Sequence, residues 1–151
     1  MPTISGEGDN ESRKRIQLRF SWIPGLFAVC RLPSNAPTPE WAWSGPFTSV
    51  TRTADELSIV CLADNLPADV DSKHHWMCFK LEGPFAFSEV GILASFVDPL
   101  AENGVPVFAI STHDTDYVLV HRTVSSLHYV AGLSVALSAW DGLPDTAWWL
   151  R

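Results

Sequence analysis

The sequence predicts an α+β protein in which a unit with an antiparallel sheet occurs twice along the chain. Short runs rich in Val, Ile, Leu and Phe, bounded by Gly, Pro and Asp, are typical of strands. One segment of the second half instead repeats its apolar residues every three or four positions, which is typical of a helix. Both halves show the same order of a strand, a helical segment, two strands and a further element.

The first half begins with a strand and continues with a hairpin. Pro33, Pro37 and Pro39 restrict residues 33–46 to at most a short helix, because proline cannot donate a backbone hydrogen bond. The polar residues 67–75 are expected to connect the halves. The expected elements are strands at 27–32, 47–53 and 56–62 and the short helix at 40–43.

The second half has the clearer helix signal. Ser88 is expected to cap a helix that Asn103 and Gly104 end. The two halves align with an offset of 49 residues at their first strands and 60 at their hairpins, which pairs Val60 with Val120 and Ile59 with Leu119. The expected elements are strands at 76–81, 105–111 and 116–121 and helical segments at 88–102 and 124–137.

These elements divide the chain into four parts. Residues 1–15 are polar and charged and are expected to be a disordered leader, in which Arg13, Lys14 and Arg15 form a basic run. The first unit is expected at 16–70, the second at 71–139, and an aromatic tail at 140–151.

Composition narrows the function classes. The 151 residues carry a net charge of −7, which argues against a nucleic-acid partner because phosphate binding needs clustered cations. No apolar stretch approaches the roughly 20 residues that cross a bilayer, so a cytoplasmic protein without membrane contact is expected. Cys30, Cys61 and Cys78 are spaced too widely for a zinc site and lie in apolar runs, which predicts buried reduced thiols and no metal.

Several runs of this sequence resemble a known family. FAVCRLP, SVTRTADELSIVC and EGPFAFSEVGILASFVDPLAENGVPVFAISTHDTDYVLV are similar to the small ACT-domain proteins related to the regulatory domain of aspartate kinase and to the cytosolic arginine sensor. The resemblance implies two ferredoxin-like βαββαβ units packed side by side. It also implies a free amino acid as ligand near the interface of the units, with a homodimer or a protein partner carrying the output.

The segment from Ser88 to Leu93 is the first candidate site. The unpaired N–H groups and dipole of a helix start suit an α-carboxylate, and Gly91 would let a ligand approach the backbone. The alternative is that Ser88 caps the helix and Gly91 allows tight packing; the resemblance supports the ligand, because ACT domains commonly hold ligands at this loop. The candidates are Ser88, Glu89, Val90, Gly91, Ile92 and Leu93.

The turn of the second hairpin is the second candidate site. Its carboxylates could pair with an α-ammonium group, or its side chains could satisfy only local backbone groups. A catalytic or metal role for the neighbours His113 and Asp114 is disfavoured, because adjacent strand residues point to opposite faces. In the equivalent turn, Arg52 is expected to pair with Asp55 or Glu56. The candidates are Ser111, Thr112, His113, Asp114 and Asp116.

The leading interpretation is an amino-acid-binding regulatory or sensor protein without a cofactor. An enzyme that reuses an amino-acid pocket is the less favoured alternative, with His113, Asp114, Asp116 and Glu89 as acid/base candidates. A structural adaptor with a degenerate pocket is the third. Turnover would distinguish the enzyme, and stabilisation by a ligand would distinguish the sensor from the adaptor.

Overall fold

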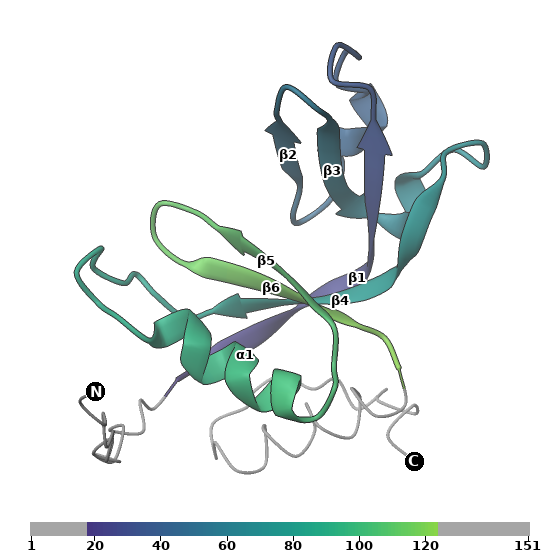
Figure 1. The fold of residues 1–151 in the computed structure, drawn as a ribbon. Coiled ribbons are helices and arrows are strands. Elements are labelled where there is room, and N and C mark those ends of the chain that lie inside the picture. Colours follow the sequence, from purple (N-terminus) through teal and green to yellow (C-terminus); the bar gives the residue numbers. More distant parts are fainter. Residues whose placement is uncertain (1–17, 124–151) are drawn as a thin grey trace, which may run out of the picture.

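The computed structural model describes residues 18–123, which form one six-stranded antiparallel sheet (Figure 1). The expected leader, the helical segment 124–137 and the aromatic tail lie outside the described residues. The strands are β1 (Phe20–Leu32), β2 (Ser49–Arg52), β3 (Leu57–Leu62), β4 (Ser72–Leu81), β5 (Val107–Ser111) and β6 (Asp116–His121). The helices are α1 (Ile92–Glu102) and the short 3₁₀ helices η1 (Glu40–Trp43) and η2 (Ala63–Asn65). None of these helices has the length and apolar character needed to cross a membrane.

All six expected strands are present, and the short helix after the first strand is η1. The starts of two strands were predicted at least four residues too late. β1 begins at Phe20 rather than at residue 27, and β4 begins at Ser72, inside the segment expected to be a connector. The polar start of β4 pairs with the end of β1, where Lys73 lies opposite Val29. A strand partner distant in the chain therefore supplies the hydrogen bonds that the local sequence gives no reason to expect.

The sheet has an internal pseudo-twofold arrangement. Its strand order, β2-β3-β1-β4-β6-β5, reads the same from both edges when β1 is matched with β4, β2 with β5 and β3 with β6. The registers agree, because Phe27 lies opposite Leu62 in the first half and Trp76 lies opposite His121 in the second. Phe27 and Trp76 also face each other across β1 and β4. The first strands are thus related by the expected offset of 49 residues.

The hairpins are related by an offset of 59 residues, not 60. Thr53 N donates to Glu56 O at 2.9 Å, and Thr112 N donates to Thr115 O at 2.8 Å, so both turns contain two residues between the closing pair. A shift of one residue exchanges the two faces of a strand. Val60 therefore corresponds to Leu119 rather than to Val120. Three consecutive residues are buried in both β3 and β6, so the apolar pattern alone does not show which residues of these strands share a face of the sheet.

The two long strands join the halves into one sheet. The first residues of β1 pair with the end of β4, and the first residues of β4 pair with the end of β1. The register shifts on either side of Phe27, and Gly25 has a φ of +104°, which glycine adopts readily at such a bend. The halves therefore share strands, and two separate sheets lying side by side are not what the described residues show. In the first half, the four residues of η1 stand where α1 stands in the second.

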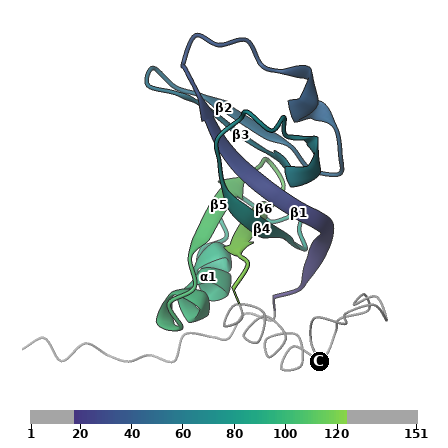
Figure 2. The same ribbon diagram turned by 90° about the vertical axis from the view of Figure 1, so that its right-hand side faces the viewer.

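Three groups of apolar residues form the core. One lies between α1 and the sheet and includes Phe79, Phe96 and Val118. A second group lies beside η1, and its buried members are Cys30, Ala42, Leu57, Ile59 and Cys61. The third contains residues of both halves, including Phe27, Val60 and Leu119. Figure 2 shows β2 and β3 of the first half at the end of the molecule away from α1. The expected burial of the cysteines is confirmed, since all three are buried free thiols.

Candidate functional site

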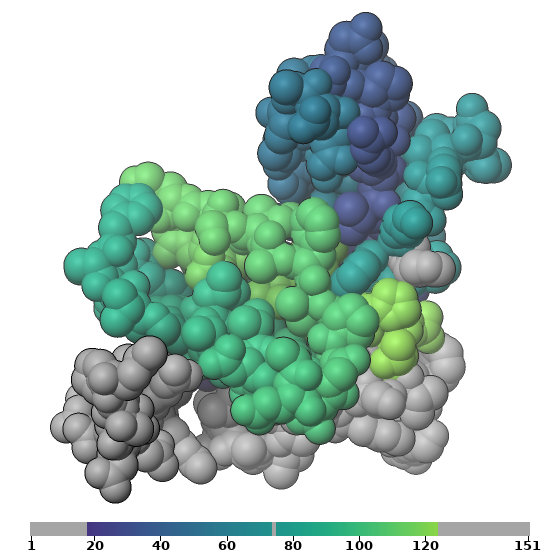
Figure 3. Space-filling model, viewed as in Figure 1, coloured from purple at the N-terminus to yellow at the C-terminus, as the bar shows by residue number. Residues whose placement is uncertain are grey.

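The two candidate segments meet at one end of the second half. We call residues 82–91 and 112–115 the loop–turn junction; Figure 3 shows the loop and the turn side by side at the left edge. Phe85 N donates to Asp114 O at 2.9 Å, and the buried Thr115 hydroxyl donates to Leu81 O. At Gly83 the backbones come so close that an added Cβ would lie 2.7 Å from Asp114 O. Main-chain contacts therefore hold the loop against the turn.

Helix α1 begins four residues later than expected. Ser88 was expected to cap it, but the N-cap is Gly91, which has a left-handed backbone with φ of +81°. Glu89 N donates to Ala86 O at 2.9 Å, so Ser88 lies within a separate turn before the helix. Gly91 has no side chain that could accept a hydrogen bond from the first helical turn. The positive end of the helix dipole is therefore left without a side-chain cap.

The turn presents one imidazole and one carboxylate to solvent. His113 Nδ1 lies 2.7 Å from Asp114 Oδ1, and the two side chains are 83% and 73% exposed. The expectation that these neighbours point apart was wrong, because they occupy the two turn positions rather than a strand. The Asp116 carboxylate accepts a hydrogen bond from the Ser111 hydroxyl at its Oδ1, at 2.5 Å. Asp116 is half-buried whereas Asp114 is exposed, so Asp114 is the carboxylate of this turn with the greater access to solvent.

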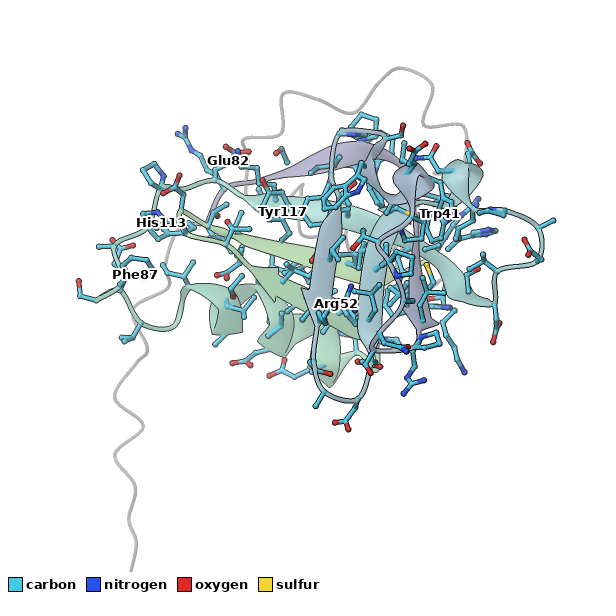
Figure 4. The ribbon with its side chains drawn as sticks, turned by 90° about the horizontal axis from the view of Figure 1, so that it is seen from above. Trp41, Arg52, Glu82, Phe87, His113 and Tyr117 are labelled. Atoms are coloured by element: carbon cyan, nitrogen blue, oxygen red, sulfur yellow. The ribbon has the colours of Figure 1, made fainter. Side chains whose placement is uncertain are left out.

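The loop contributes an aromatic side chain that was not among the sequence candidates. Phe87 is 83% exposed and packs edge to face on His113, with ring centroids 5.2 Å apart (Figure 4). A lone Phe in a loop gives no sequence signal for such a contact. Among the expected residues, Ser88, Glu89, Val90 and Gly91 are exposed in the loop. Ile92 and Leu93 pack against the core beneath α1 and have a structural role.

The equivalent junction of the first half is built from side chains. Arg31 Nη2 donates to Asp55 O at 2.9 Å, and its Nε lies 2.9 Å from Glu56 Oε2. Asp55 corresponds to Asp114 at the offset of 59, so a guanidinium group occupies the acceptor that the Phe85 N–H occupies in the second half. Arg52 was expected to pair with Asp55 or Glu56, and that expectation was wrong, because Arg31 is the partner of Glu56.

Arg52 instead closes the first-half loop. Its guanidinium group donates to the carbonyl oxygens of Ser34 and Ala36, the latter at 2.8 Å. Arg52 therefore fills two carbonyl acceptors of that loop.

The junction offers groups that could bind a charged ligand. Within residues 18–123 no group of three or more His, Cys, Asp or Glu side chains could hold a metal ion. An exposed carboxylate, a helix start and an apolar ring suit a small zwitterion with both charges satisfied.

Comparison with protein families identifies the second half. A model of the ACT domain matches residues 71–124, which contain β4, α1, β5, β6 and the whole loop–turn junction. A second model, described as an N-terminal domain, matches residues 25–69. The ACT domain is a ferredoxin-like fold associated with small-molecule-binding regulation. No curated protein matches the sequence.

Two solved structures match most of the chain. Protein Atu0741 from Agrobacterium tumefaciens is 43% identical, with a TM-score of 0.70, over 80% of this chain and 88% of its own. The chain therefore belongs to the same family as Atu0741. In this chain the residues matched by the ACT model follow those matched by the N-terminal model. Protein VC0802 from Vibrio cholerae, described as a protein of unknown function and possible transport protein, shares the fold at 20% identity and a TM-score of 0.60, over 76% of this chain and 87% of its own.

Proposed function

We propose that the protein is a regulatory or sensor protein that binds a free amino acid at the loop–turn junction of its ACT domain. One observation carries the proposal: the loop that leads to the uncapped start of α1 is fixed by main-chain contacts to a turn with an exposed carboxylate. The resemblance to the aspartate kinase regulatory domain and the arginine sensor supports an amino acid as the ligand class.

The two charges of an amino acid have complementary groups at the junction. Its α-carboxylate would accept hydrogen bonds from N–H groups in the first turn of α1, where the dipole favours negative charge. Its α-ammonium group would donate to the Asp114 carboxylate, which is 73% exposed and bonded only to the neighbouring His113 in the described contacts. Phe87 would pack against the ligand side chain.

A ligand at the junction lies close in sequence to the contact between the halves. Tyr117, three residues after Asp114, stacks on Phe47 of the first half with ring centroids 4.4 Å apart. A displacement of the turn would therefore reach the aromatic pair through β6. Such a ligand regulates only if it binds one arrangement of the halves more tightly than another. The output would pass to a second copy or to a protein partner in the cytoplasm.

A thermal-shift screen against the twenty amino acids tests the proposal. A ligand present at about one hundred times its Kd adds roughly 2.7 kcal/mol of stability, which is a shift of several degrees for a domain of this size. Asp114→Asn should remove the response because it removes the charge that pairs with the ammonium group. Asp55→Asn, at the equivalent turn position of the first half, is the matched control and should keep the response. A screen without any response would refute amino-acid sensing.

A further inference from the structure

The loop–turn junction carries an exposed surface of apolar and acidic side chains. Among the described residues, Trp43, Phe87, Val90 and Val107 are the large apolar side chains that stand exposed. Phe87 and Val90 lie three residues apart in the loop, 83% and 84% exposed. We call the apolar–acidic patch the surface formed by Phe87, Val90, Glu82, Glu89 and Asp114. Large exposed apolar side chains on one loop indicate an interaction surface more strongly than single scattered ones do.

The first described residues of the chain lie next to this patch. Glu82 N donates to Arg19 O at 2.8 Å, and the Ser21 hydroxyl donates to Glu82 Oε1 at 2.6 Å. Figure 4 shows Glu82, Phe87 and His113 at the same end of the molecule. The residues that precede β1 therefore enter the fold beside the first residue of loop 82–91.

The sequence just before this point is basic. Arg13, Lys14 and Arg15 are consecutive, and Arg15 is four residues from Arg19. Four residues span at most about 14 Å and six about 20 Å, so the chain length allows the basic run to reach the patch from Arg19. Covalent linkage gives such a segment an effective concentration in the millimolar range without any further affinity.

We propose that the basic run Arg13–Lys14–Arg15 binds the apolar–acidic patch of its own chain. Its cations would pair with Glu82, Glu89 and Asp114, and their aliphatic stems would cover Phe87 and Val90. The cations already at this end, Arg19 and Lys80, are outnumbered by these carboxylates and Asp116. A second copy is a poorer occupant, since the patch would face its own acidic groups. The contact would also shield Asp114 from an amino acid. This competition rests on the proposed function, whereas the contact itself does not.

A spin label beside the basic run tests the contact in the full-length chain. Ser12→Cys supplies the attachment point, and the three native cysteines are buried, so the unsubstituted chain serves as the labelling control. The amide signals of Phe87 and Val90 should lose at least half their intensity, whereas those of the equivalent turn residues Ala54 and Asp55 should not change. The loss should diminish when salt is raised from about 0.05 to about 0.5 M, because the contact is electrostatic.

Charge reversal makes the test specific. Arg13→Glu, Lys14→Glu and Arg15→Glu together should abolish the signal loss, and adding Glu89→Lys with Asp114→Lys should restore it. Equal signal loss in the reversed and native chains, or no loss in the native chain, would overturn the proposal. If the screen yields an amino acid, the triple reversal should raise its affinity severalfold. If the native chain shows the signal loss but the triple reversal binds the amino acid with unchanged affinity, only the proposed competition is refuted. If no amino acid gives a thermal shift, only the proposed sensor function is refuted.

Discussion

Gly83 is the position where a single methyl group tests whether the loop and turn act as a unit. In Gly83→Ala the new Cβ would lie 2.7 Å from Asp114 O and 3.2 Å from the Thr115 Cβ. Restoring an ordinary contact of 3.4 Å requires a retreat of about 0.7 Å, which lengthens the 2.9 Å bond from Phe85 N to Asp114 O to about 3.6 Å. That distance is no longer a hydrogen bond.

The expected destabilisation follows from two losses and one gain. A lost backbone hydrogen bond costs about 1 kcal/mol, and overpacking costs about 1–3 kcal/mol. The reduced freedom of the unfolded chain returns about 0.4–1 kcal/mol. The free energy of unfolding of Gly83→Ala should therefore fall by about 2 kcal/mol, and the response to a bound amino acid should fall with it because the turn has moved.

Urea unfolding measures the first effect and the thermal-shift response the second. Gly104→Ala is the control, since Gly104 has a φ of +67° with nothing within 4 Å of an added Cβ. It should lose about 1 kcal/mol from its left-handed backbone alone and keep the ligand response. If Gly83→Ala lost no more stability than Gly104→Ala and bound as well as the native chain, the close backbone approach at the junction would be refuted.

Two further predictions concern the core. A double-mutant cycle with Phe47→Leu and Tyr117→Leu should give a coupling of about 0.5–1.5 kcal/mol in urea unfolding, because their rings stack at 4.4 Å; additive losses would show no direct contact. Burial raises the pKa of Cys78 from 9.0 to about 12, so the folded chain retains a proton that the unfolded chain releases between these values. Stability should therefore fall as pH rises from about 9 toward 12, and Cys78→Ala should decline less steeply over that range in urea titrations.

The local elements could be predicted because each depends on residues close in sequence. The hairpin turns contain short polar residues between apolar runs, and α1 ends at Asn103 and Gly104 as expected, with Asn103 as its C-cap. As the prolines predict, the segment between β1 and β2 forms only the short helix η1. These signals act through backbone donors and permitted dihedral angles, which a single sequence displays directly.

The remaining features depend on partners that are distant along the chain. The start of β4 is polar and becomes a strand only because the end of β1 supplies its hydrogen bonds. The offset of 59 is set by the closing pairs of the two turns, and the apolar runs fit 60 equally well. Similarly, Arg31 pairs with Glu56 across two strands whose register the sequence does not reveal. The junction itself was predicted as two separate segments, and the Phe87–His113 contact was not foreseen.

The pseudo-twofold sheet finally explains why the proposed site should occur once per chain. Both halves place a loop beside a two-residue turn, yet the first-half junction is filled by the guanidinium groups of Arg31 and Arg52. In the second half a backbone N–H rather than a guanidinium group holds the corresponding carbonyl, and the Asp114 side chain is 73% exposed. Calorimetry should accordingly give one ligand per chain, and Arg52→Ala should destabilise the first half by about 1 kcal/mol without changing that stoichiometry. Two ligands per native chain would show that the arginine contacts yield to ligand and that the halves are functionally equivalent.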